Sequence, residues 1–172
     1  MDGLQPPFNW ALCILMDSSE LLRKIESLFP LIDKPARHEI STHNDDCMEC
    51  RYVRKESAKY DMEISTEGLR WFHNELSLFS GKGLVWVLTS LLRYCVSVDD
   101  TYDGVETEYL IYHLSPAKEY ESNTISQLDA FSRDQVDCLI SFICWCKNHQ
   151  YWKDYCLEDI EKAEHFLKKI NA

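Results

Sequence analysis

One histidine and two cysteines lie within eight positions of each other in the stretch THNDDCMECRY. They are His43, Cys47 and Cys50, with the spacing H-x3-C-x2-C. Thiolate sulfur and imidazole nitrogen are ligands that zinc binds in tetrahedral geometry. Asp46, followed three residues later by Glu49, predicts that a helix starts here. Both sulfurs would then lie on one face of the helix, within reach of the histidine. The sequence therefore predicts a zinc site made by these three residues.

The number of ligands decides what such a zinc ion could do. A structural zinc normally takes four protein ligands, whereas a catalytic zinc keeps one position open for water. The nearest candidates for a fourth ligand are His38 and Asp45, and His73 or His113 could reach the site from another helix. With a fourth ligand the ion would pin the preceding loop to the helix. With an open position the same residues would suit a zinc-dependent enzyme.

The same cysteine pair permits a redox interpretation. A C-x-x-C motif at a helix N-terminus is the thioredoxin arrangement, and the helix dipole there lowers the pKa of a thiol. The sequence lacks the preceding strand and the Gly-Pro setting of that fold. A thiol redox protein using Cys47 and Cys50 is therefore the second alternative, beside a reduced pair with no chemistry. No other stretch combines a nucleophile, a base and an orienting group, so no catalytic residues are predicted.

The net charge of −11 is concentrated in one part of the chain. Residues 95–137 contain ten carboxylates against Lys118 and Arg133, which gives −8 for this segment. Such a charge repels phosphates, so direct nucleic-acid binding is excluded. It favours a basic protein partner through electrostatic steering, in the manner of an immunity protein that masks a nuclease toxin. The alternative is an acidic face that only maintains solubility. The predicted partner-binding residues are Asp99, Asp100, Asp103, Glu106 and Glu108.

Composition indicates a cytoplasmic globular protein. The longest apolar runs are too short to span a bilayer, and the first ten residues lack the basic region of a secretory signal. A disulfide framework is typical of short secreted chains, whereas 172 residues suffice for a hydrophobic core. We therefore expect most of the eight cysteines to be buried thiols. These are Cys13, Cys95, Cys138, Cys144, Cys146 and Cys156, which lie mainly in apolar helical patterns.

Apolar periodicity predicts a mainly α-helical fold, with residues 1–172 forming one compact domain of about six to eight helices. A loop with two prolines is expected near residues 30–44, and a surface connection at 117–130. Asp17, Ser80 and Ser132 are the expected capping residues. The helix at 81–96 is apolar nearly all round and should lie in the middle of the fold. The predicted helices span 17–29, 46–60, 65–79, 81–96, 105–115, 132–147 and 157–170. For 105–115 a strand is the alternative, since β-branched and aromatic residues alternate there.

The order of these features resembles a family of small uncharacterised bacterial proteins. Its members carry an H-x-C-x-x-C type motif before a short helix, then a leucine-rich and aromatic helix, and then F-x-x-x-Q before a last long helix. Here His43, Cys47 and Cys50 match the first element, LSLFSGKGLVWVLTSLLRYC the second and LDAFSRDQVDCLISFI the third. The match covers about residues 38–146. The histidine is further from the first cysteine, and Thr89 replaces a proline. The resemblance implies one helical domain containing the cysteine motif, and no known activity.

Overall fold

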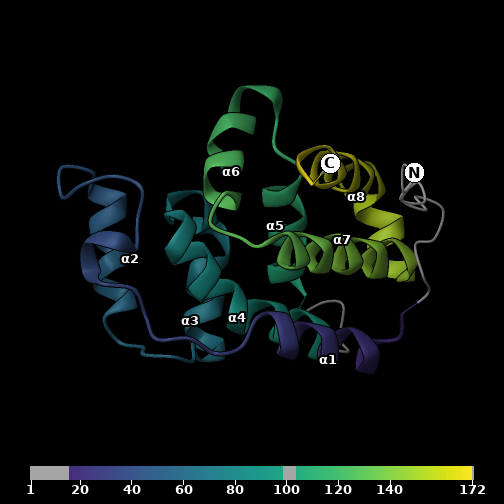
Figure 1. The fold of residues 1–172 in the computed structure, drawn as a ribbon, viewed down its shortest axis with the longest axis horizontal. Helices are drawn as coiled ribbons and strands as arrows, with labels where there is room; N and C mark the ends of the chain where they lie inside the picture. The colour runs from purple at the N-terminus through teal and green to yellow at the C-terminus, as the bar shows by residue number, and fades with distance from the viewer. Residues whose placement is uncertain (1–15, 99–103, 172) are drawn as a thin grey trace, which may run out of the picture.

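Helices make up nearly all the regular structure of residues 16–98 and 104–171, the part of the chain that the computed structural model describes (Figure 1). In chain order they are α1 (Ser18–Leu28), η1 (Arg37–Glu39), α2 (Met48–Ser57), α3 (Thr66–Phe72), η2 (His73–Leu78), α4 (Gly81–Ser97), α5 (Val105–Leu114), η4 (Lys118–Tyr120), α6 (Glu121–Leu128), α7 (Arg133–Asn148) and α8 (Gln150–Ile170), where η marks a 3-10 helix. The predicted mainly α-helical domain of six to eight helices is confirmed.

Side chains that cap the first turn decide where several helices begin. Asp17 accepts a hydrogen bond from the backbone N–H of Glu20 at 2.8 Å at the start of α1. At the start of α7, Ser132 and Gln135 each accept from the backbone N–H of the other, which completes a capping box. Ser80 caps α4 by accepting from the backbone N–H of Gly83 at 3.0 Å. These side chains satisfy backbone donors that have no partner within the helix, so the predicted caps are confirmed.

Helix α4 lies at the centre of the fold and packs against α1, α3, α5 and α6. Its apolar side chains point in nearly every direction, and Leu84, Trp86 and Leu91 are fully buried. The Trp86 indole N–H donates to the carbonyl of Asp61 at 2.7 Å, which ties the segment after α2 to this core. The predicted central position of this helix is confirmed, because a helix without a polar face must be covered on all sides.

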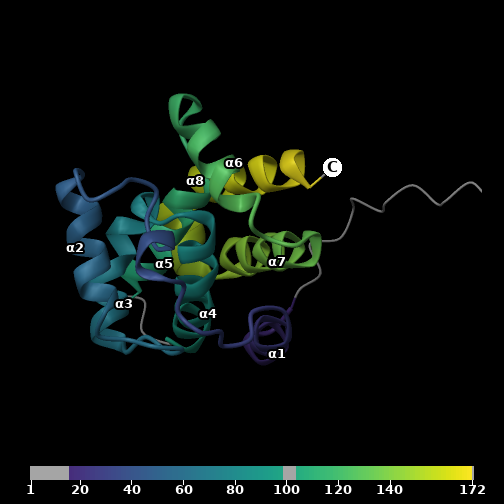
Figure 2. The same cartoon turned by 60° about the vertical axis from the view of Figure 1, so that its left-hand side comes forward.

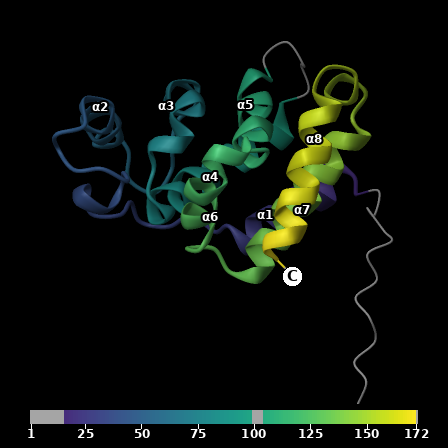
Figure 3. The same cartoon turned by 90° about the horizontal axis from the view of Figure 1, so that it is seen from above.

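The other helices divide between two ends of the molecule. Helices α7 and α8 pack against each other at one end, with α1 alongside α7 and α5 alongside α8 (Figures 1 and 3). Helix α2 lies at the opposite end, where its main packing partner is η2. The chain between α1 and α2 runs from one part of the molecule to the other (Figure 2). The predicted metal ligands lie at the end of this connection.

The predicted loop before α2 contains one short 3-10 helix and is held to the core by its backbone. The carbonyl of Ile40 accepts from the N–H of Ser80, and the N–H of Thr42 donates to the carbonyl of Leu78, both at 2.9 Å. Gly83 makes this approach possible, since a Cβ at that position would stand 2.0 Å from the Ile40 oxygen. The segment next to the candidate metal ligands is therefore anchored at its N-terminal side.

Three segments, in addition to the start of α2, differ from the sequence prediction. Residues 117–130 are not a surface connection, because they form η4 and α6, and Gln127 on α6 is buried. Its side-chain amide donates to the carbonyls of Leu76 and Phe79 at 2.9 and 2.6 Å. The predicted helix at 65–79 becomes 3-10 after Phe72. The last helix begins at Gln150, seven residues earlier than predicted, with a kink at Cys156.

The cysteines predicted to lie in the core are buried wherever the structure describes them: Cys95, Cys138, Cys144, Cys146 and Cys156. Cys13 falls outside the described residues. Burial raises the pKa of Cys95 to about 12 and that of Cys138 to about 11, because the charged thiolate is poorly solvated there. The Cys95 and Cys138 thiols are therefore protonated at neutral pH, whereas Cys144 is disulfide-bonded and is not the free thiol that was expected. Within residues 16–98 and 104–171, no helix combines the length and apolar character required to cross a bilayer.

Candidate metal centre

A cysteine caps the N-terminus of α2. Cys47 is the N-cap, and its sulfur accepts from the backbone N–H of Cys50 at 3.4 Å. The sequence placed Asp46 at this position, which is wrong by one residue. The N–H of Asp46 instead donates to the Asn44 side chain at 3.1 Å, in a local turn that Asn favours. As a result, both sulfurs lie within the first turn of the helix, where His43 approaches from the loop.

The three predicted ligands come together. The Nδ1 atom of His43 lies 3.6 Å from the sulfur of Cys50, and the donor atoms of His43, Cys47 and Cys50 all lie within 4.8 Å of one another. Cys50 is buried, Cys47 is half-buried and His43 is exposed. This group is close enough to hold a metal ion. The H-x3-C-x2-C spacing therefore correctly predicted that these three side chains lie close together.

The Cys47 thiol does not have the lowered pKa that its helix position suggested. The backbone N–H of Cys50 is the largest influence and stabilises the thiolate. The Cys50 side chain, partial burial and the neighbouring Glu49 carboxylate together outweigh it, so the pKa of Cys47 is raised above 9.0. A raised pKa disfavours the redox alternative, which needs a reactive thiolate. A metal ion that bound here would displace the proton.

Arg54, which the sequence analysis did not single out, holds the loop that carries His43. Its guanidinium donates to the carbonyls of His43 and Asn44 at 2.7 and 2.9 Å, and to the Asp45 carboxylate at 2.8 Å. It also bonds the hydroxyl of Ser41. The side chain is only 3 % exposed, so the guanidinium end of these charge-assisted bonds is shielded from water. A signal was present in the sequence, because Arg54 lies one turn after Cys50 and so on the same helix face.

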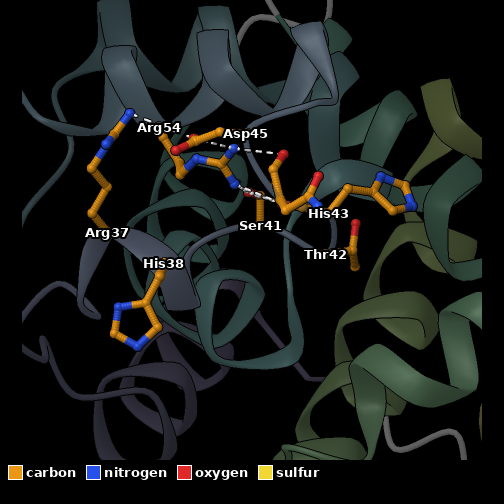
Figure 4. A pocket seen from close by; sticks show the side chains of 8 residues that line it. Arg37, His38, Ser41, Thr42, His43, Asp45 and Arg54 are labelled. Atoms are coloured by element: carbon orange, nitrogen blue, oxygen red, sulfur yellow. Dashed lines mark hydrogen bonds and ion pairs between the residues drawn. The ribbon is translucent and has the colours of Figure 1, made fainter.

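A cavity of about 550 Å³ lies beside this loop. Figure 4 shows the Arg54 guanidinium near Asp45, with the side chains of Arg37 and His38 on one side and the His43 ring directed to the other. The lining residues are Arg37, His38, Ser41, Thr42, His43, Asn44, Asp45 and Arg54. The cavity therefore combines two arginines with one carboxylate that bonds Arg54.

The four residues proposed from the sequence as a fourth ligand are not in the group. Asp45 is engaged by Arg54 and lies 3.6 Å from Arg37. His38 lines the cavity on the side away from the His43 ring (Figure 4). His73 and His113 line a separate cavity of about 270 Å³. Among the described residues, the group that could hold a metal therefore contains only His43 and the two cysteines.

Comparisons with known proteins found no match to this chain. No family model matches this chain. No curated protein and no solved structure matches it either. The resemblance to the bacterial family with the H-x-C-x-x-C type motif therefore stays a prediction, and function has to be argued from the geometry.

The predicted partner-binding residues do not form one exposed patch in the described part of the chain. Glu106 is 1 % exposed and lies 3.4 Å from the Nε of Arg70, so it is removed from the predicted surface. Its position in the first turn of α5, beside an arginine of α3, explains how a carboxylate can be buried there. Glu108 is half-buried and accepts from the Tyr112 hydroxyl. Asp99, Asp100 and Asp103 lie outside the described residues.

Proposed function

We propose that this protein is a non-enzymatic binding protein in which zinc, held by His43, Cys47 and Cys50, fastens the loop after α1 to the start of α2. The proximity of the three donor atoms, all within 4.8 Å of one another, carries the metal part of the proposal. Two thiolates and an imidazole favour zinc, because magnesium, calcium and manganese prefer oxygen ligands.

The position of the site supports a structural role for the ion. Helix α2 has ten residues, and isolated helices of that length are marginal in water. It lies at one end of the molecule, with η2 as its main packing partner. An ion that joins His43, before the helix, to Cys47 and Cys50, in its first turn, would stop the helix from fraying. Its binding free energy would add directly to the stability of this end of the fold.

Metal analysis of the purified full-length protein tests the zinc part. We expect one tightly bound zinc ion per chain, lost in Cys47→Ser and Cys50→Ser because serine does not replace a thiolate ligand. Met48→Ser is the matched control, since Met48 lies in the same helical turn and is 52 % exposed. The proposal is wrong if the native protein, after incubation with zinc, retains none of the ion in the presence of a competing chelator.

For the binding partner we propose a basic protein, masked in the way that an immunity protein masks a nuclease. The net charge of −11 and the isoelectric point near 4.9 support this, since they steer a cationic partner towards the chain. Within the acidic segment, Glu119, Asp129 and Asp134 are exposed. They would join Asp99, Asp100 and Asp103 as the residues that a basic partner meets.

Charge reversal tests the steering part of this proposal. The partners are basic proteins that the native chain retains at low salt. Replacing Asp99, Asp100 and Asp103 by lysine should lower their association rate constants by about tenfold or more. The control reverses three exposed carboxylates elsewhere, which are Glu26, Asp33 and Glu63. Equal association rates for the two variants would show that the acidic segment does not guide a partner.

A zinc-dependent enzyme is a second candidate, which the cavity favours. His43 lines this space of about 550 Å³ together with Arg37 and Arg54, and arginines suit an anionic substrate. The reaction would require a zinc position open to water. Whether the ion keeps such a position depends on the fourth ligand.

A further inference from the structure

Glu49 stands between the two cysteines in the first turn of α2, and its side chain turns back towards one of them. The Oε2 atom of Glu49 lies 3.4 Å from the sulfur of Cys47. An exposed glutamate at this position could instead extend into water. The side chain beside the cluster is therefore a carboxylate, which is one of the groups that zinc binds.

Two distances match those between neighbouring ligands of a tetrahedral zinc ion. With Zn–S bonds of about 2.3 Å and Zn–N or Zn–O bonds of about 2.0–2.2 Å, a sulfur and a second ligand atom are about 3.5 Å apart. The observed separations are 3.6 Å for Cys50 Sγ and His43 Nδ1, and 3.4 Å for Cys47 Sγ and Glu49 Oε2. The two pairs share no atom, and they would become opposite edges of one tetrahedron if the Glu49 carboxylate moved closer to the other ligands.

The Glu49 carboxylate has to move before the site is closed. Glu49 does not belong to the set of donor atoms that all lie within 4.8 Å of one another. Its carboxylate must therefore turn about its own side-chain bonds when the ion enters. The side chain is exposed, so no packing opposes that rotation. The alternative carboxylate, Asp45, would first have to leave its ion pair with the buried Arg54.

We propose that the Glu49 carboxylate is the fourth zinc ligand and that it closes the site formed with His43, Cys47 and Cys50. This inference rests on the zinc site of the proposed function and goes one step beyond it. A site with four protein ligands has no position for a reactive water. The ion would then be structural, and the zinc-dependent enzyme would be excluded.

Zinc affinity, measured by competition with a chromophoric chelator, tests the ligand. Glu49→Ala and Glu49→Gln should weaken zinc binding by at least about tenfold, the lower end of the loss seen when only a supporting group is removed. Asp46→Ala is the matched control, because it removes one exposed carboxylate next to Cys47 without removing a ligand. Equal affinities in the Glu49 variants and the control would overturn the inference. Circular dichroism checks that each variant keeps the helical fold.

Cobalt substitution and azide test whether the site is closed. The native protein loaded with Co²⁺ should show intense tetrahedral absorption bands that azide leaves unchanged. In Glu49→Ala the same bands should shift when azide enters the vacated position. A native spectrum that responds to azide would overturn the inference and support the enzyme. If the native chain bound neither Zn²⁺ nor Co²⁺, the proposed function itself would fail, which is a different result from the loss of the Glu49 contribution alone.

Discussion

His113 on α5 shows how strongly the fold changes the chemistry of a single side chain. Its Nε2 atom is buried and has no hydrogen-bond partner in the part of the chain that the structure describes. Burial lowers the pKa of His113 to about 4, because a charged imidazole would be poorly solvated there. The residue lines the cavity of about 270 Å³ with His73 and Tyr109. His113 is therefore neutral in the folded protein at any physiological pH.

This histidine predicts a loss of stability on acidification. Between pH 6.5 and about 4 the unfolded chain binds a proton at His113 and the folded chain does not. The free energy of unfolding should therefore fall as the pH drops through this range, by at most about 3 kcal/mol. Urea unfolding at pH 7.5, 5.5 and 4.5, with a chelator present, measures the effect.

Two histidine variants separate this contribution from other titrating groups. His113→Gln should have a shallower dependence of unfolding free energy on pH, since glutamine does not titrate. His165→Gln is the control, because His165 is exposed on α8. An identical pH dependence in the native chain and His113→Gln would contradict the prediction.

At the scale of elements, the junction between the loop and α2 depends on one buried arginine. Arg54 joins the carbonyls of His43 and Asn44 and the Asp45 carboxylate from a position that is almost inaccessible to water. Removal of the guanidinium would leave several acceptors without their donor, which costs more than the bonds contribute when made. This network places His43 before any ion is bound.

We therefore expect Arg54→Met to destabilise the chain and weaken zinc binding together. The free energy of unfolding should fall by about 2–5 kcal/mol, as for other buried charged groups whose partner is removed. Arg51→Met is the matched control on the same helix, because Arg51 is exposed. Chemical denaturation and chelator competition measure the two effects. Stability and affinity equal to those of the control would show that the loop is held in another way.

At the scale of the whole molecule, the candidate metal centre and the largest helix pair lie at opposite ends. Helices α7 and α8 pack along each other and against α1 and α5, and they bury side chains such as Phe142 and Ile160 completely. Helix α2 relies mainly on η2 and on its anchored loop. Local stability follows the density of buried contacts, so the two ends should respond differently to loss of the ion.

Hydrogen exchange should reveal this difference. Chelation of zinc should speed amide exchange in residues 43–57, which hold the ligands and α2. The amides of α7 and α8 should exchange at unchanged rates, because their packing does not involve the site. Mass spectrometry of the protein with and without chelator makes the measurement, with Cys47→Ser as a zinc-free reference. Faster exchange at both ends would mean that the ion stabilises the whole domain.

Local patterns were enough to predict most helices and the candidate ligands. Capping residues and apolar periodicity act over three to seven residues, so Asp17 and Ser132 marked helix starts in the sequence. The gathering of His43, Cys47 and Cys50 was predictable for the same reason, since one helical turn and a short approach bring them together.

Contacts between distant segments could not be predicted in this way. The sequence pattern of helix α6 is weak, and in the fold Gln127 ties this helix to carbonyls about fifty residues earlier in the chain. The sequence analysis placed Glu106 on a charged surface, whereas in the fold it is buried beside Arg70. Periodicity reports which face of an element is apolar. It does not report which polar groups contact each other in the interior. The burial of a polar side chain and the identity of its partner depend on how the elements pack.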